Sequence, residues 1–553
     1  MNVQPKNAQS TGYWDRETAL VAQFAACISF ISFAYYFQHG GLLLYGDAVA
    51  HINIARRVFD SRTPGLLQLG TVWLPLPHLL MIPFLLSDTA WQSGIGGSVP
   101  SMVAYVLGTA GIFRLVRSAL SANSQPDPPA RIAAWLSAIV YAANPNLIYL
   151  QTTAMTESLY LALFIWAVVY FGEFVQESSP NDGSPGATSS SLLKCGLCLA
   201  AACVTRYDGW FLAAAMCVAG LMVILKGDHQ ALRRSFTKFV LLAAAAPVLW
   251  LTYNAIIYRN PLEFANGPYS ARSIEQKNAT PSFPSHPGSH DLPVAFSYFL
   301  KSAELNVAEG SWQKLWVALL LVWTVTILIL HRRLWSLLLL WVPVPFYMLS
   351  IAYSGVPIFV PTWWPLSLYN VRYGLQLLPL FSVAGALTTY FLLRLVRNKS
   401  AKTAVVSATA ILLAASYASV WRAQPVCFRE AWVNSRTRIA LETELASNLK
   451  KLPRDSTMLM YLGDHVGALQ QAGIPLRRTI NEGNHRPWKA PVDREGLWER
   501  ALAKPSQYVD FVVALDGDPV AVGAQRQGLP SLAVIRTVGQ PPATIYWTHR
   551  YSW

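Results

Sequence analysis

The chain of 553 residues is 53% hydrophobic and only 13% charged. Soluble domains carry roughly a quarter of charged residues, so this composition excludes an ordinary soluble protein of this length. The formal net charge of +14 falls largely in the loops between apolar segments, and it therefore gives no support to nucleic-acid binding.

Apolar runs long enough to cross a bilayer recur throughout the first 420 residues, and they predict about eleven transmembrane helices. The expected spans are 19–37, 98–118, 132–149, 157–175, 192–204, 209–226, 237–258, 313–330, 334–353, 371–393 and 403–420. The span 192–204 is short and is expected to be tilted or partly buried. The segment 73–87 is also apolar, but Pro75, Pro77 and Pro83 interrupt it. We expect it to lie at the interface or to re-enter the membrane.

Basic residues cluster on one side of these spans. They include Arg114 and Arg117, Arg233 and Arg234, Arg332 and Arg333, and Arg394 and Arg397. Because loops rich in Lys and Arg stay in the cytoplasm, this side is predicted to be cytoplasmic. The sequence thus indicates an integral protein of a bacterial inner (plasma) membrane, with a cytoplasmic N-terminus and a periplasmic C-terminal domain.

The composition divides the chain into a transmembrane catalytic module, 1–420, and a soluble part, 421–553. Within the module, 38–97 forms the first extracytoplasmic loop, and 259–312, rich in Pro, Ser, His and Asn, forms a long one that is expected to cover a site. Strand-like runs at 457–462, 508–515 and 543–547 and a helix near 466–472 predict a small α/β domain. The expected fold class is an α-helical polytopic membrane protein with a small extracytoplasmic α/β C-terminal domain.

A charged cluster follows directly on the first span, at residues 45–60. From 48 to 59 the pattern is amphipathic, with an apolar face of Ala48, Ile52, Ala55 and Phe59 and a polar face of Asn53, Arg56, Arg57 and Asp60. This pattern predicts a short helix that rests on a membrane surface.

Asp47 stands just before this helix, and His51 projects in a similar direction one turn later. Two compatible roles are open for Asp47. It is an N-cap that accepts backbone N–H bonds, or a catalytic carboxylate, because ionisable groups held at a membrane are usually functional. His51 is either structural or takes a direct part in the chemistry.

Three further motifs lie on the same predicted side of the membrane. They are Thr-Glu-Ser-Leu-Tyr at 156–160, Thr-Arg-Tyr-Asp-Gly-Trp at 205–210 and Asn-Val-Arg-Tyr-Gly-Leu-Gln-Leu-Leu-Pro at 370–379. In this order, after an extracytoplasmic Asp and a proline-rich helix, they resemble the GT-C glycosyltransferases, in particular the protein O-mannosyltransferases and the lipid A aminoarabinose transferases. The likeness covers residues 15–395. The Asp-Glu pair usual in that family is here Asp47-Ala48.

The resemblance implies an inverting transfer of a sugar from a polyprenyl phosphate to an acceptor hydroxyl. Asp47 is then the general base, with Glu157 and His51 as further catalytic residues. The lipid phosphate gains charge as it leaves, and Arg372, Arg206 and His78 are the residues expected to bind it. Asp208, Tyr373 and Trp364 are expected to contact the substrate.

Structural alternatives remain open for several of these residues. Arg206 would form an ion pair with Asp208. Arg372 would be a snorkelling helix anchor, and Glu157 would be an exposed carboxylate at a helix start. No cofactor is indicated, and a divalent metal is left open without being indicated. His286, His290 and Asp291 lack a defined spacing for a metal, and Asp516-Gly517-Asp518 is a common turn sequence.

The expected partners are the polyprenyl-phosphate sugar donor, an acceptor protein, lipid or glycan, and the lipid bilayer, with no nucleic acid. Two other functions are considered. A secondary transporter usually carries inverted repeats around a midplane site, and no repeat is visible here. An oligosaccharyltransferase-like enzyme would carry a Trp-Trp-Asp motif in its tail, and residues 421–553 lack one.

Overall fold

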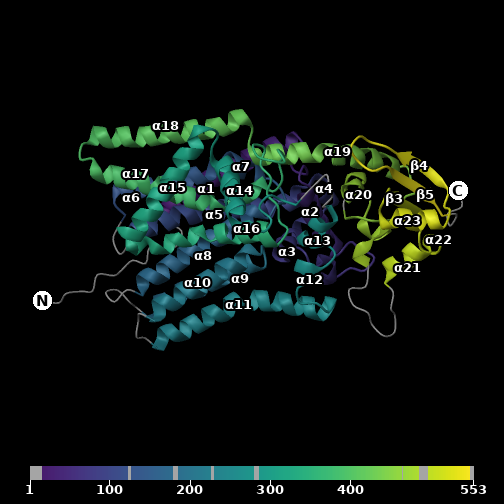
Figure 1. The fold of residues 1–553 in the computed structure, drawn as a ribbon, viewed down its shortest axis with the longest axis horizontal. Coiled ribbons are helices and arrows are strands. Elements are labelled where there is room, and N and C mark those ends of the chain that lie inside the picture. Colours follow the sequence, from purple (N-terminus) through teal and green to yellow (C-terminus); the bar gives the residue numbers. More distant parts are fainter. Residues whose placement is uncertain are drawn as a thin grey trace.

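The computed structural model describes residues 15–121, 126–178, 185–225, 230–278, 285–463, 465–484 and 496–548. These residues form an elongated helical bundle with a small α/β unit at one end (Figure 1). The main helices of the bundle are α1 (Arg16–Gln38), α5 (Ile95–Leu120), α6 (Pro128–Ala142), α8 (Glu157–Glu177), α9 (Pro185–Cys203), α10 (Asp208–Leu225), α11 (Gln230–Tyr258), α14 (Leu292–Val307), α15 (Ser311–Ile329), α16 (Pro343–Tyr353), α17 (Leu378–Leu395) and α18 (Lys399–Ala423). The 3₁₀ segments η3 (Arg332–Trp341) and η4 (Val371–Leu377) lead into α16 and α17.

Nine segments of the described chain are long and apolar enough to cross a membrane, and each coincides with a predicted span. The two other predicted spans fall short. The apolar part of the helix near 192–204 is only Ser190–Cys203. The prediction of one helix over 132–149 is wrong, because α6 ends at Ala142 and a separate α7 (Pro145–Leu150) follows. Pro145 has no N–H to continue α6, and the Asn144 side chain caps α7 by accepting the N–H groups of Asn146 and Leu147.

Short helices fill the connections that face the α/β unit. Between α1 and α5 they are α2 (Gly46–Arg57), η1 (Leu66–Leu69), α3 (Leu76–Met81), η2 (Ile82–Leu85) and α4 (Asp88–Ser93). After α11 they are α12 (Glu263–Asn266) and α13 (Ala271–Asn278). The proline-broken segment 73–87 thus becomes α3 and η2, which together are too short to span a bilayer.

The C-terminal unit follows α19 (Val426–Leu449) and contains a five-stranded sheet in the order β2-β1-β3-β5-β4. Its strands are β1 (Met458–Met460), β2 (Thr479–Ile480), β3 (Phe511–Leu515), β4 (Ser531–Ile535) and β5 (Ala543–Trp547). Its helices are α20 (Gly467–Ala472), η5 (Leu476–Arg478), η6 (Glu482–Asn484), α21 (Leu497–Ala503), α22 (Pro505–Tyr508) and α23 (Pro519–Arg526). The α/β character and three of the strands agree with the sequence, whereas β2 and β4 were not expected.

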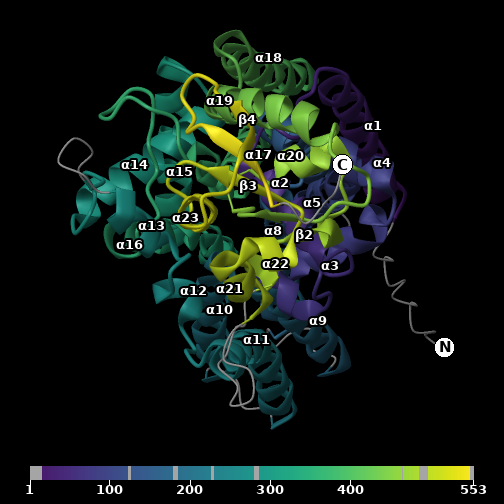
Figure 2. The same cartoon turned by 90° about the vertical axis from the view of Figure 1, so that its right-hand side faces the viewer.

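The C-terminal unit packs directly on α2, as the view of this end in Figure 2 illustrates. Asn53 donates to Gln470 Oε1 at 2.7 Å, and Asp60 accepts the backbone N–H of Leu476 at 3.2 Å. Arg56 pairs with Asp60 at 2.9 Å and is itself buried. The expectation that α2 rests on a membrane surface is therefore wrong, because protein buries its apolar face and also its polar face. That face is covered by protein, and its polar groups are paired there.

Candidate functional site

A cavity of about 490 Å³ lies among the helix ends of the bundle. Its walls come from α2, the starts of α8 and α10, the last turns of α16, and η4. Of the residues expected at the site, Asp47, His51, Glu157, Arg206, Asp208, Arg372 and Tyr373 all line it. Segments more than 300 residues apart in sequence thus meet at one cavity.

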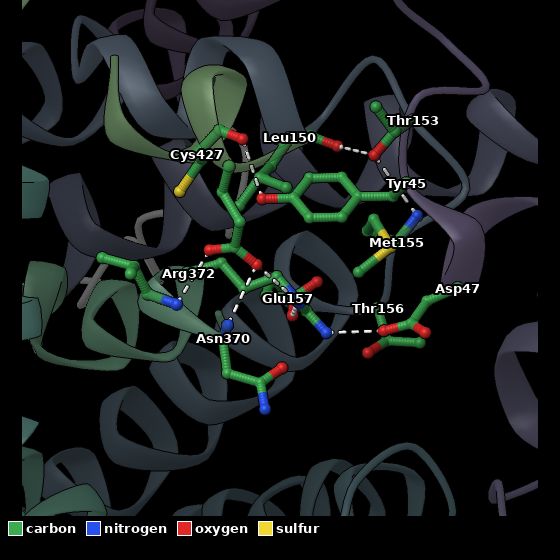
Figure 3. Close-up of polar contacts among 12 residues, drawn as sticks. Tyr45, Asp47, Leu150, Thr153, Met155, Thr156, Glu157, Asn370, Arg372 and Cys427 are labelled. Atoms are coloured by element: carbon green, nitrogen blue, oxygen red, sulfur yellow. Dashed lines mark hydrogen bonds and ion pairs between the residues drawn. The ribbon is translucent and has the colours of Figure 1, made fainter. Parts of the chain in front are cut away.

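Asp47 occupies the first turn of α2 and forms an ion pair with Arg372, with 2.5 Å between Oδ2 and Nη2 (Figure 3). The N-cap position belongs to Tyr45, and no side chain caps this helix. The N-cap reading of Asp47 is therefore wrong. The side chain is 43% exposed, and Oδ1 has no hydrogen-bond partner among the described residues. One carboxylate oxygen is held in place, and the other is free to accept a proton.

Arg372 is buried and bonded to three carboxylates, so it is not a snorkelling anchor. Besides Asp47, its Nε lies 3.2 Å from Glu157 Oε1 and its Nη1 lies 2.8 Å from Glu430 Oε1. Glu157 is fully buried at the start of α8, which excludes the exposed helix-start reading. Charges buried in this way are stable only when they are paired.

Arg206 forms the second cationic centre of the site. It pairs with Glu157 at 3.3 Å and with Asp208 at 3.3 Å, which matches the structural alternative for this residue. Its Nη2 also donates to the hydroxyl of Tyr347 at 2.9 Å, and that hydroxyl donates to Asp208 at 3.2 Å. Glu157 therefore bridges the two guanidinium groups.

Tyr373 lies between these two arginines. Its ring centroid is 4.9 Å from the guanidinium carbon of Arg206 and 5.0 Å from that of Arg372. The negative face of an aromatic ring attracts a cation at such a distance. Tyr373 therefore helps to hold the two arginines at a fixed separation on one wall of the cavity.

Glu430, from α19, was missed by the sequence analysis. Its carboxylate accepts the backbone N–H groups of Asn370 at 3.0 Å and Val371 at 2.8 Å, in addition to Arg372. No local pattern marks this residue, because its partners lie about 60 residues earlier in the chain. Tyr347 was also missed, since a tyrosine within an apolar span carries no signal of its own.

His51 and His78 form a buried pair beside the cavity. Nδ1 of His51 lies 2.9 Å from Nε2 of His78, and the His51 ring packs against Trp73 with 4.7 Å between centroids. Burial, together with the charges of Arg372 and Arg206, lowers the pKa of His51 to about 3. Burial also lowers the pKa of His78 well below its ordinary value. Both rings are therefore neutral at physiological pH.

Two of the expected site residues lie outside the cavity lining. His78 is fully buried behind His51. Trp364 is half-exposed, and its backbone carbonyl accepts a hydrogen bond from Tyr298 at 2.6 Å. Neither side chain lines the cavity, and His78 reaches it only through its contact with His51.

The long connection between α11 and α14 supplies part of the cavity wall through Phe264, Ala265, Ala271 and Arg272. These residues belong to the loop 259–312, so part of this loop lies against the cavity. Arg272 is exposed and has no carboxylate partner among the described residues. Arg272 could have been identified from the sequence, because it is a cationic residue in a loop that was expected to cover a site.

Three of the possible metal ligands have structural roles. No group of three or more His, Cys, Asp or Glu side chains in the described ranges is placed to hold a metal ion. Asp518 caps α23 by accepting the N–H of Ala521, and Asp291 caps α14 by accepting that of Val294. His286 accepts the N–H of Gly288 at 2.9 Å.

No protein-family profile matches the sequence, and no curated protein sequence matches it either. Among solved structures, ArnT from Cupriavidus metallidurans bound to undecaprenyl phosphate aligns with a TM-score of 0.57 at 13% identity, covering 96% of this chain and 98% of that one. The same protein in the apo state aligns with a TM-score of 0.55 at 12% identity over the same shares. At such identities the likeness shows the fold alone. This chain is a polytopic helical membrane protein with the fold of ArnT.

Proposed function

We propose that this protein is a membrane glycosyltransferase that moves a sugar from a polyprenyl-phosphate donor onto an acceptor hydroxyl with inversion. The observation that carries the proposal is the Asp47–Arg372 pair at the cavity, in which a half-exposed carboxylate touches a buried guanidinium. Such a pair joins a base to a phosphate-binding group. The ArnT structure of the same fold was solved with undecaprenyl phosphate bound, which supports the donor class.

The chemistry assigns a separate task to each group. The acceptor hydroxyl oxygen attacks the anomeric carbon of the sugar while the bond from that carbon to the phosphate oxygen breaks. The hydroxyl proton passes to Oδ1 of Asp47, and the electron pair of the broken bond leaves with the lipid phosphate. Arg372 keeps the Asp47 carboxylate in place by donating to Oδ2. Arg372 also lines the cavity, where its guanidinium group can stabilise the leaving phosphate.

The charge balance of the site calls for one more cation. Asp47, Glu157, Asp208 and Glu430 supply four carboxylates, whereas Arg206 and Arg372 supply two guanidinium groups. An anionic donor would therefore enter a region with an excess of negative charge. Arg272, exposed at the cavity wall on α13, carries the uncompensated positive charge that a phosphate needs.

The position of the cavity supports an enzyme more than a transporter. Its residues come from the first turns of α8 and α10 and the last turns of α16, so they gather at one end of the spans. Transporters bind their substrates near the bilayer midplane. We place the site on the extracytoplasmic side, as the distribution of basic loops predicts.

The proposal is tested with purified protein in lipid nanodiscs and a panel of undecaprenyl-phosphate hexoses and pentoses. Mass spectrometry follows the release of undecaprenyl phosphate in the presence of membrane extracts as the acceptor source. We expect release from at least one donor, and binding of undecaprenyl phosphate itself that weakens in Arg372→Ala. Absence of both from a folded protein would refute the proposal.

A further inference from the structure

The pair formed by His51 and His78 restricts where each ring carries its proton. Nδ1 of His51 and Nε2 of His78 are 2.9 Å apart, so one of them is protonated and the other accepts. A neutral imidazole carries one N–H and one bare nitrogen. The pair therefore has two possible arrangements, which differ in the direction of this hydrogen bond.

The surroundings of His78 distinguish these two arrangements. His78 is fully buried, and its other nitrogen, Nδ1, has no hydrogen-bond partner among the described residues. If the proton of His78 were on Nδ1, a buried N–H would be left unpaired. If the proton is on Nε2, only a lone pair is unpaired. Buried N–H groups without partners are rarer in proteins than acceptors with a free lone pair, because they cost more.

His78 therefore donates from Nε2 to Nδ1 of His51, and His51 carries its own proton on Nε2. His51 lines the cavity, and the described residues offer no partner to its Nε2. His51 thus presents an N–H donor to the cavity. It has no free nitrogen there with which to accept a proton.

We propose that His51 is a hydrogen-bond donor to a phosphate oxygen of the lipid-linked substrate, and that His78 is the positioning residue that fixes its tautomer. This inference rests on the proposed function and deepens it. The phosphate contact expected of His78 is assigned to His51, because His78 does not line the cavity. His51 is no longer a candidate for the catalytic base. An anionic oxygen is the favoured acceptor because a hydrogen bond to a charged oxygen is stronger than one to a neutral oxygen, and because Arg272 at the wall of the same cavity carries an uncompensated positive charge.

In this arrangement Asp47 and His51, one turn apart on α2, have different roles. Asp47 has a free carboxylate oxygen and accepts the proton of the attacking hydroxyl. His51 has a fixed N–H and donates to the leaving group. Residues four apart share one face of a helix, so both side chains reach the same cavity, one turn of α2 apart. The attacking and leaving oxygens lie on opposite sides of the anomeric carbon in an inverting transfer, which requires two such groups.

Nitrogen NMR of the full protein tests the tautomers directly. The chain has 10 histidines, so the imidazole nitrogens are labelled with ¹⁵N and the two rings are assigned from His51→Gln and His78→Gln variants. We expect both rings to be neutral and protonated on Nε2. We also expect added undecaprenyl phosphate to shift the Nε2 signal of His51 and to shift that of His78 much less.

Several outcomes separate this inference from the proposed function. A proton on Nδ1 of His51 overturns it, and so does bound undecaprenyl phosphate that leaves the His51 Nε2 signal unmoved. Failure of the lipid to bind would count against the proposed function, while the tautomers would still be read in the free protein.

Matched variants supply an independent readout. Gln at position 51 offers an amide N–H near the Nε2 position but cannot take up a proton. Leu has no N–H to donate and cannot take up a proton either. If His51 is a donor, His51→Leu should weaken binding of undecaprenyl phosphate by about 10- to 150-fold, the range for one lost hydrogen bond to a charged group, and His51→Gln should recover most of it. Equal losses in the two variants would overturn the assignment. His78→Gln should likewise bind the lipid better than His78→Leu.

Discussion

Replacing Asp47 by Asn separates catalysis from folding and donor binding. Asn keeps the size of the side chain and can still accept a hydrogen bond from Arg372, but it cannot take up a proton. Loss of a general base costs about 10²- to 10⁴-fold in turnover, which corresponds to about 3–5 kcal/mol of barrier. The ion pair itself contributes little to folding, because the Asp47 side chain is 43% exposed and such pairs are worth about 0–1 kcal/mol.

Arg372 remains bonded to Glu157 and Glu430 in this variant. The excess of carboxylates around the cavity also falls by one, so undecaprenyl phosphate should bind at least as tightly as in the wild type. The assay is release of undecaprenyl phosphate from the sugar donor, with thermal unfolding and lipid binding measured on the same preparation.

A matched control is Asp88→Asn. Asp88 forms an ion pair of the same length, 2.5 Å, with Arg56, and its side chain is 67% exposed. It lies in the same loop and outside the cavity lining, so turnover should stay within about twofold of the wild type. Normal turnover by Asp47→Asn would refute the role of Asp47 as base, and a fall of turnover together with unfolding would show only a structural effect.

Three further predictions concern the charges around this pair. Glu430→Ala removes one of the three carboxylates bonded to Arg372 and leaves two backbone N–H groups without their acceptor. At about 1–3 kcal/mol for each unsatisfied N–H, we expect a loss of about 2–6 kcal/mol in unfolding free energy. Glu444→Ala, exposed on the same helix, should lose less than about 0.5 kcal/mol by the same thermal or chemical unfolding. Arg272→Ala should weaken binding of undecaprenyl phosphate by about five- to tenfold with unchanged unfolding, whereas equal affinity in calorimetry would remove Arg272 from the phosphate site. Since burial lowers the pKa of His51 to about 3 in the folded protein, the unfolded chain binds more protons below its ordinary pKa of about 6.5. Stability should therefore be level above pH 7 and fall as the pH drops from there toward 3, by up to about 2.7 kcal/mol at pH 4.5 for this one group, and a His51→Gln variant whose pH dependence equals that of the wild type would contradict this.

The membrane helices were predictable because long apolar runs have few alternative structures in a bilayer. Nine of the predicted spans coincide with segments long and apolar enough to cross. The failure at 132–149 has a local cause that the sequence did contain. Asn144 and Pro145 are a helix cap followed by a residue favoured in a first helical turn, and hydropathy alone conceals such a break.

The site was predictable as far as its motifs share a membrane face. Asp47 was found as a charged residue next to an apolar run, whereas Glu157, Arg206 and Arg372 were expected from the resemblance of their motifs. The structure brings all four to one cavity. Their exact bonding was not predictable, because it depends on which helix ends meet. The polar face of α2 shows the same limit. Asn53 and Asp60 have the pattern of a solvated surface, yet their partners come from beyond residue 460.

Glu430 shows why the C-terminal segment belongs to the chemistry of the site. The chain enters η4 through Asn370, which has a left-handed backbone with φ of 57°. The first N–H groups of such a segment have no partner within it. The Glu430 carboxylate accepts those of Asn370 and Val371 and in addition binds Arg372.

One carboxylate thus caps the start of η4 from a distance and orients the guanidinium that touches Asp47. If residues 421–553 were removed, Arg372 would keep its charge but lose one of its three carboxylates, and the turn that presents it would lose its cap. The transmembrane helices therefore form the cavity wall, but they do not by themselves hold Arg372 in the position that the proposed reaction requires.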